Sequence, residues 1–254
     1  MNELYLVDVT PENIVDQGLF CIKNVKSPEF AKKKDWFIDN YKNGLRIKIL
    51  YNESDKQIGY IEYIPADFAW RPVDAPDFIF IQCMYVYANK DKNKGYGSFM
   101  VKACEEDAKK QGMKGVCTMT SKGTFIANQH LFAKNGYSQV EKLERYELMV
   151  KKFDQKSQDP KLIDWTQNRK KHLGWNLIYA DQCPWNNKSV EAIKVVAHEA
   201  GVDLKVKKIT NWQQAKNAPS GFGVFSLLHN GKLLEDHYLS ASRFKNILNK
   251  ELNK

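Results

Sequence analysis

The feature that most constrains this chain is segment 78–112, where a nearly all-apolar run leads through a short turn into an amphipathic pattern. Residues 78–87 read FIFIQCMYVY, which is typical of a strand buried on both faces of a sheet. Residues 98–111 carry apolar side chains at helical spacing and stop at Gly112. This order predicts a buried strand that runs directly into a helix.

The turn between these two elements, Lys92-Asn93-Lys94-Gly95-Tyr96-Gly97-Ser98, has the chemistry of an anion site. The start of a helix presents backbone N–H groups without partners inside the helix, and the helix dipole favours an anion there. The two glycines permit close approach of a diphosphate to the backbone, and the two lysines add positive charge. The turn is neither a Walker loop, because G-K-S/T is missing, nor a Rossmann fingerprint, because the third glycine is missing.

Composition narrows the class of protein further. The 254 residues are 43% hydrophobic, 12% aromatic and 27% charged, which excludes a disordered chain and a membrane protein. The net charge of +9 suits an anionic small molecule; without a dense basic stripe, no nucleic-acid partner is expected. The five cysteines are scattered, so neither a disulfide framework nor a metal site is expected. With no signal-peptide pattern and no long apolar run, we expect a cytoplasmic protein with no membrane partner.

The chain is expected to form two domains. Residues 1–153 contain the segment described above, and residues 154–172 are polar, include Pro160 and are interpreted as a linker. Residues 173–254 repeat a strand and helix alternation, with a hairpin predicted at His229-Asn230-Gly231.

Two motifs resemble those of a known family. The turn Lys92 to Gly97 fits the coenzyme A signature Q/R-x-x-G-x-G/A of the GNAT superfamily of N-acetyltransferases, with lysine at the first position. Residues 126–137 (IANQHLFAKNGY) look like that family's A-x-x-L-Y-x-x-x-G-F segment, with Gly136-Tyr137 at its end. The segments GLRIK and GYIEYIPADFAWR and the extension beyond residue 153 most resemble YoaP-like GNAT proteins.

The resemblance implies an α/β fold with a GNAT-type mixed sheet flanked by helices, and acetyl-CoA as co-substrate. In that family the co-substrate lies in a wedge between two splayed parallel strands, here residues 78–87 and 115–120. The implied coenzyme-binding residues are the strand backbone, the turn and an asparagine near the pantetheine: Met84, Tyr85, Val86, Lys92, Asn93, Lys94, Gly95, Tyr96, Gly97, Ser98 and Asn128.

The implied reaction is direct attack of a neutral primary amine, on a small molecule or a peptide, on the thioester. Glu62 is the candidate base, because it alternates with apolar residues in 57–64 and an apolar setting raises the pKa of a carboxylate. An exposed strand carboxylate is the alternative. The family's acidic tyrosine falls on Phe132, so either Tyr96 or Tyr137 donates the proton, or the thiolate leaves unaided.

Acceptor residues are expected near the same strand and in the loop before it. Gln82 and Cys83 are candidates in the central strand, although polar residues there can simply satisfy neighbours. Trp70 and Arg71 lie in a proline-rich loop suited to covering an acceptor, or in a solvent-side loop without function.

The second domain looks like a thioredoxin-type unit, smaller than the first. Cys183-Pro184-Trp185-Asn186 stands where that fold places C-x-x-C, and without a second cysteine no intramolecular disulfide can form. Cys183 precedes a predicted helix, so it is either a reactive thiolate that contacts substrate or an inert thiol. Pro219 is a candidate for the fold's cis-proline.

Two other functions fit the same residues. The missing tyrosine allows a non-catalytic acyl-CoA-binding or sensing protein, and Cys183 allows a thiol-dependent adaptor.

Overall fold

The computed structural model describes residues 4–87, 94–123 and 125–252, and these form two compact units. The first unit comprises residues up to 25, 37–69 and 73–162, and the second comprises 26–36, 70–72 and 163–254. The division is therefore not a single cut in the sequence, since two short segments of the N-terminal half belong to the second unit. Residues 154–172, expected as a linker, include a short strand and a turn of 3-10 helix at 165–168.

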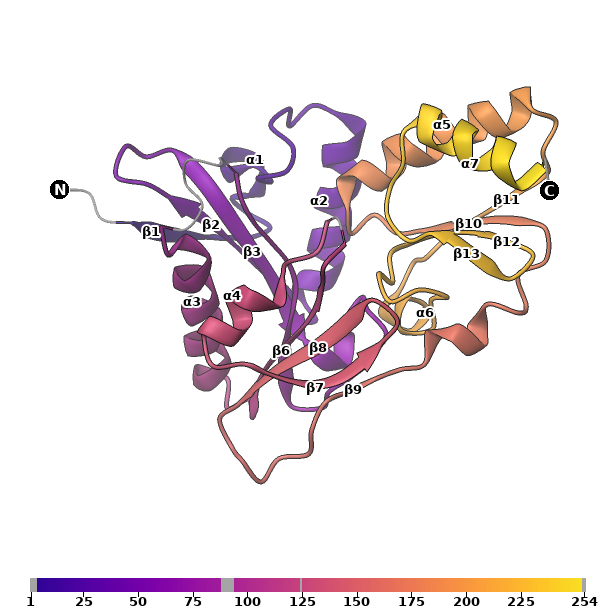
Figure 1. Ribbon diagram of the computed structural model, residues 1–254. Coiled ribbons are helices and arrows are strands. Elements are labelled where there is room, and N and C mark those ends of the chain that lie inside the picture. The colour runs from indigo at the N-terminus through magenta and orange to yellow at the C-terminus, as the bar shows by residue number, and fades with distance from the viewer. Residues whose placement is uncertain (1–3, 88–93, 124, 253–254) are drawn as a thin grey trace. The chain divides into compact units, whose positions relative to one another are not determined.

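The first unit is built on a seven-stranded mixed sheet with strand order β1-β2-β3-β5-β6-β8-β7 (Figure 1). The β5–β6 pair is parallel and the other neighbours are antiparallel. The strands are β1 (Tyr5–Val9), β2 (Arg46–Tyr51), β3 (Gln57–Pro65), β5 (Phe78–Val86), β6 (Gly115–Ser121), β7 (Ser138–Leu143) and β8 (Tyr146–Lys152); β4 (Val73–Asp74) pairs with β9 (Lys161–Leu162).

Helix α3 packs against the middle of this sheet and buries the core of the unit. Its contacts are with β3, β5 and β6. Met100, Val101 and Cys104 of α3 form one hydrophobic cluster with Ile61 and Ile81 of the sheet. Burying these side chains is the main favourable contribution to folding here. The α-helices described before residue 153 are α1 (Ile14–Gln17), α2 (Pro28–Tyr41), α3 (Tyr96–Lys110) and α4 (Gln129–Lys134).

The second unit contains a four-stranded sheet with strand order β11-β10-β12-β13. The β10–β11 pair is parallel, and β12 is antiparallel to both β10 and β13. Helices α5 and α7 contact each other, and α5 also contacts β10 (Figure 1). The elements are β10 (Trp175–Tyr179), α5 (Pro184–Glu199), β11 (Leu204–Lys208), α6 (Trp212–Lys216), β12 (Phe225–His229), β13 (Lys232–Glu235) and α7 (Ala241–Leu252).

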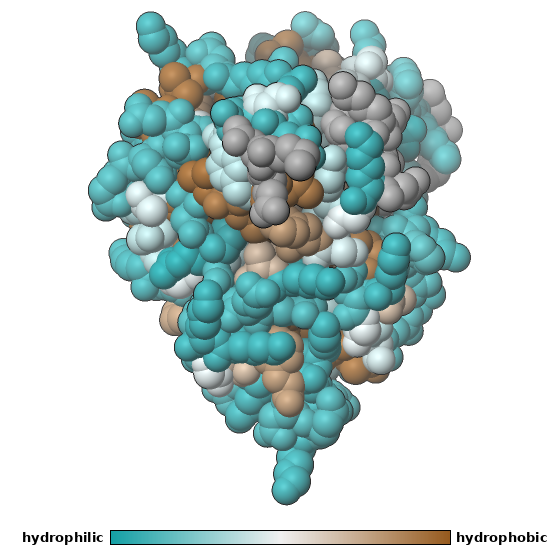
Figure 2. Space-filling view, turned by 90° about the vertical axis from the view of Figure 1, so that its left-hand side faces the viewer, coloured by the Kyte–Doolittle hydropathy of each residue, from teal (hydrophilic) through white to brown (hydrophobic). Residues whose placement is uncertain are grey.

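The polarity of the surface agrees with the composition. The face drawn in Figure 2 is mainly hydrophilic, with hydrophobic residues in separate small patches. Within the described ranges, no helix combines the length and the apolar character that crossing a bilayer requires.

Candidate functional site

The two parallel strands of the central sheet, β5 and β6, are paired over only part of their length. The pairing of β5 with β6 runs only from Phe78↔Gly115 to Ile81↔Thr118, although β5 continues to Val86. On its other side, β5 remains paired with β3 as far as Val86. The strand positions expected to hold the pantetheine, Met84 to Val86, therefore lie beyond the last β5–β6 pair. Backbone groups on that edge of β5 can pair with an extended ligand.

The two strands separate next to a β-bulge in β5. Glu62 of β3 is opposite Cys83, but the next residue, Tyr63, is opposite Ile81, so Gln82 is the extra residue. A bulge bends its strand and increases the local twist. Its position beside the last β5–β6 pair accounts for the divergence of the two strands.

The N-terminus of α3 provides an anion site in the part of the turn that the structure describes. Gly95, with a φ of 85°, precedes the helix in the left-handed conformation, and no side chain caps the helix start. The first helical hydrogen bond runs from the Phe99 N–H to the Gly95 carbonyl at 2.9 Å, so the preceding N–H groups lack helical partners. The first turn holds no acidic residue, and the exposed Lys94 precedes it. Lys92 and Asn93 lie outside the described residues.

Three of the other predicted coenzyme residues have structural roles as well. A side chain at Gly97 would meet Leu131 of α4 at 3.1 Å, so this glycine permits the close packing of α3 against α4. The Ser98 hydroxyl accepts a hydrogen bond from Asn135 at 2.9 Å. The Asn128 Oδ1 accepts from the His130 N–H at 2.9 Å and caps α4, and the residue as a whole is exposed.

The candidate base, Glu62, lies on the face of the sheet opposite α3. Its paired neighbour Cys83 shares that face, whereas the alternate residue Ile61 packs under α3. Glu62 is 1% exposed, and its Oε1 accepts a hydrogen bond from the Gln82 amide at 3.3 Å. The alternative of an exposed strand carboxylate is therefore wrong.

Tyr60, which we did not single out from the sequence, belongs to the same group. Its hydroxyl lies 2.8 Å from the Cys83 Sγ. Burial raises the pKa of Tyr60 well above its usual value, and Cys21, Cys83 and Glu62 add to the rise. The phenol thus stays protonated and acts as a hydrogen-bonding group. Alternation along 57–64 placed Tyr60 on the face of Glu62, but Cys21 comes from a distant loop that no sequence pattern connects to it.

The position of the family's catalytic tyrosine is part of the core. Phe132 is fully buried and packs edge-on against Tyr137, with ring centroids 5.3 Å apart. Burial raises the pKa of Tyr137 well above its usual value, and the neighbouring Cys104 and Glu105 raise it further. Tyr137 is therefore a poor proton donor. Tyr96, the first residue of α3, is half-buried.

The proline-rich loop differs from expectation. Trp70 is 2% exposed and packs edge-on against Trp36, with ring centroids 5.2 Å apart. Arg71 is also buried and lies over the Phe222 ring at 4.7 Å. The solvent-side loop was the wrong alternative, and the contacts of Trp70 are those of a core residue of the second unit.

The loop around Cys183 is held by asparagine side chains. Cys183 is half-buried and directly precedes α5, with Pro184 at the first helical position. The fully buried Asn186 amide donates to the carbonyls of Ala180 (2.9 Å) and Val224 (2.8 Å), bridging the two central strands. The expectation of a cis bond at Pro219 is wrong, because every peptide bond between described residues is trans.

These features define the class of protein. Residues 16–137, which include the end of the β5–β6 pairing and the uncapped start of α3, match the model of the acetyltransferase (GNAT) family. Residues 203–246 match the YoaP-like family model. The chain therefore carries a GNAT acetyltransferase domain, followed by a YoaP-like region.

A full-length relative and several solved structures are similar to this chain. An uncharacterized N-acetyltransferase of Bacillus subtilis (strain 168), YoaP, is 25% identical over 249 residues, which cover 96% of this chain and 98% of that protein. The PaiA N-acetyltransferase of Thermoplasma acidophilum, solved with coenzyme A, is 14% identical, with 59% and 99% of the chains covered and a TM-score of 0.43. The aminoglycoside acetyltransferase AAC(6')-Ib, solved with coenzyme A, is 16% identical, with 59% and 95% covered and a TM-score of 0.45.

Proposed function

We propose that the protein transfers an acetyl group from acetyl-CoA to a primary amine. The observation that carries the proposal is the early end of β5–β6 pairing beside the uncapped start of α3. The diphosphate of the coenzyme is held by the N–H groups at the start of α3 and by Lys94, with Lys92 and Asn93 in the same turn. The pantetheine pairs with the backbone of Met84 to Val86, and the Asn128 amide contacts it near the thioester.

Glu62 is the proposed base. The protonated amine passes a proton to this carboxylate, and the neutral nitrogen attacks the carbonyl carbon of the thioester. The C–N bond forms and the C–S bond breaks. The acetylated nitrogen loses its extra proton, which the thiolate takes up, and the proton on Glu62 is released to solvent. Positioned base catalysis contributes about 10²- to 10⁴-fold. Because Phe132 has no proton to give and Tyr137 holds its proton tightly, the thiolate leaves without a tyrosine acid from α4 or its following turn.

The second unit is proposed to be thioredoxin-like and to assist acceptor binding. Its order of elements from β10 to α7, with a parallel β10–β11 pair and a final antiparallel hairpin, supports this relationship. A second cysteine is replaced by Asn186, whose amide bridges two strands, so a dithiol reaction is not part of the proposal.

The test is turnover with a panel of primary amines. Acetyl-CoA consumption is followed as free thiol, and the acetylated amine is identified by mass. The proposal expects one thiol and one N-acetyl product per turnover. Binding of acetyl-CoA without any acetylated product would instead indicate a sensing protein. If the wild type transfers no acetyl group but its thiol forms a thiolate near neutral pH, and Cys183→Ser abolishes that thiolate, the protein would be a thiol-dependent adaptor.

A further inference from the structure

Four aromatic side chains form a cluster on the face of the sheet that carries Glu62. Phe20, from the segment after α1, contacts Tyr60, Tyr85 and Tyr87 with ring centroids 5.3, 6.5 and 6.1 Å apart. We refer to these four residues as the aromatic patch. The rings are tilted or edge-on to Phe20, the arrangements that aromatic pairs prefer.

Strand register places the aromatic patch directly beside the proposed base. Tyr60 is opposite Tyr85, and Glu62 is opposite Cys83, so these four side chains share one face in two adjacent rows. Successive rows on one face are about 7 Å apart, because a strand rises about 3.3 Å per residue and side chains alternate. A ligand group that packs on Tyr85 is thus separated by about 7 Å, the span of a short linker, from an amine nitrogen at Glu62.

The outer half of the aromatic patch, Tyr85 and Tyr87, is exposed to solvent rather than buried in a core. Tyr85 is 51% exposed and Tyr87 is 58% exposed, whereas β5 is buried from Phe78 to Gln82. Lys23 lies over the Tyr87 ring, with its Nζ 5.4 Å from the centroid. This contact covers part of one face of the Tyr87 ring and places a positive charge at the outer end of the patch, while more than half of the Tyr87 side chain stays exposed.

We infer that the acceptor is a primary amine joined by a linker of two or three carbons to a flat aromatic ring. This inference rests on the proposed acetyl transfer and names its substrate class. The ring lies on Tyr85 and Tyr87, and the linker spans one strand row so that the amine reaches Glu62. Lys23 disfavours a second ammonium group at the outer end, which argues against polyamines. Aromatic ring faces also offer few hydrogen bonds to a polyhydroxylated amine.

The inference is tested with two amines that share the linker and ring size but carry a flat aromatic or a saturated ring, 2-phenylethylamine and 2-cyclohexylethylamine, together with spermidine. The expected ratio of kcat/KM for phenyl over cyclohexyl is about 10-fold, the effect of a good aromatic contact. Tyr85→Leu and Tyr87→Leu should each reduce the ratio toward one, and Tyr85→Phe should keep it. Tyr5→Leu is the matched control, because Tyr5 is a half-exposed tyrosine stacked on Tyr51 at 5.2 Å, outside the patch.

The outcomes distinguish failure of the aromatic acceptor from failure of acetyl transfer itself. Equal kcat/KM for the two amines, a preference that survives both leucine variants, or a preference for spermidine overturns the aromatic acceptor while acetyl transfer stands. If no amine in a broad panel is acetylated, acetyl transfer itself fails and the inference fails with it. Titration of 2-phenylethylamine into the CoA complex by calorimetry provides a second readout, in which tighter binding than 2-cyclohexylethylamine is expected and equal binding would count against it.

Discussion

Replacing the proposed base gives the sharpest prediction about chemistry. Glu62 is 1% exposed, and its Oε1 accepts from the Gln82 amide at 3.3 Å. Glu62→Gln keeps the size of the side chain and an oxygen that can accept this hydrogen bond, but it removes the proton acceptor. We expect kcat to fall about 10²- to 10⁴-fold, equivalent to about 3 to 5 kcal/mol in activation free energy. The free energy of unfolding should change by only about 1 kcal/mol.

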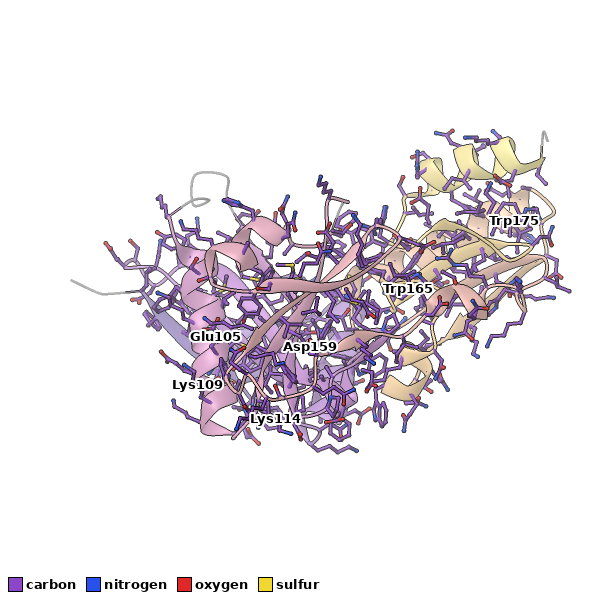
Figure 3. All side chains as sticks on the ribbon, turned by 60° about the horizontal axis from the view of Figure 1, so that its bottom comes forward. Glu105, Lys109, Lys114, Asp159, Trp165 and Trp175 are labelled. Carbon is purple, nitrogen blue, oxygen red and sulfur yellow. The ribbon has the colours of Figure 1, made fainter. Side chains whose placement is uncertain are left out.

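The assay is free-thiol release with a saturating amine, measured from about pH 6 to about pH 9. The variant should show a flatter dependence of kcat on pH than the wild type. Glu105→Gln is the matched control, because Glu105 is 5% exposed, lies on α3 (Figure 3) and pairs with Lys151 at 2.7 Å, away from the acceptor face. It should lower stability without altering the pH profile. Unchanged turnover of Glu62→Gln at every pH would refute the assignment of the base.

Three further predictions concern stability and are measured by urea unfolding. Desolvation raises the pKa of Asp107, but hydrogen bonds from Tyr63 and Lys48 lower it by more, so the pKa lies below its usual value. The charged carboxylate therefore stabilises the fold above about pH 4. Tyr63→Phe should therefore cost about 2 kcal/mol at neutral pH, and the loss should shrink as acid protonates the carboxylate; a loss independent of pH would contradict this. Gly115→Ala should cost about 3 kcal/mol because its Cβ would lie 2.4 Å from the Lys151 carbonyl, whereas Gly95→Ala, with open space around it, should cost about 1 kcal/mol for its positive φ; equal losses would refute the distinction. Asn186→Ala should cost about 2 kcal/mol by removing two buried hydrogen bonds, although the Val224 carbonyl keeps the Ala180 N–H at 3.0 Å, and a neutral effect would show that the bridge is dispensable.

The central elements were predictable because their signals are local. The apolar run of β5 and the helical spacing of α3 gave both elements within about two residues of their observed limits. The alternation of strands and helices in the second unit and its hairpin at His229-Asn230-Gly231 were also predicted. Strand β7 was missed because SQVEKL is polar and lies at an exposed sheet edge, where it is held by pairing with β8 rather than by its own pattern.

The errors at the site come from long-range packing. The prolines around Trp70 resemble those of a surface loop, yet this tryptophan is buried against Trp36 and the Gly223 backbone, which are distant in sequence. The aromatic patch was missed for the same reason, since Phe20 precedes its partner Tyr60 by about forty positions. The bulge at Gln82, which sets which side chains face Glu62, depends on the pairing of β3 with β5 and cannot be read from either strand alone.

The most direct test of the account compares how the folded protein binds acetyl-CoA and acetyl-pantetheine, measured by calorimetry. Both ligands carry the thioester, but only acetyl-CoA carries the diphosphate that the start of α3 is proposed to hold. The account predicts clear binding of acetyl-CoA, weakened by added salt, and much weaker binding of acetyl-pantetheine. No heat with acetyl-CoA, or equal affinity for the two ligands, would contradict it.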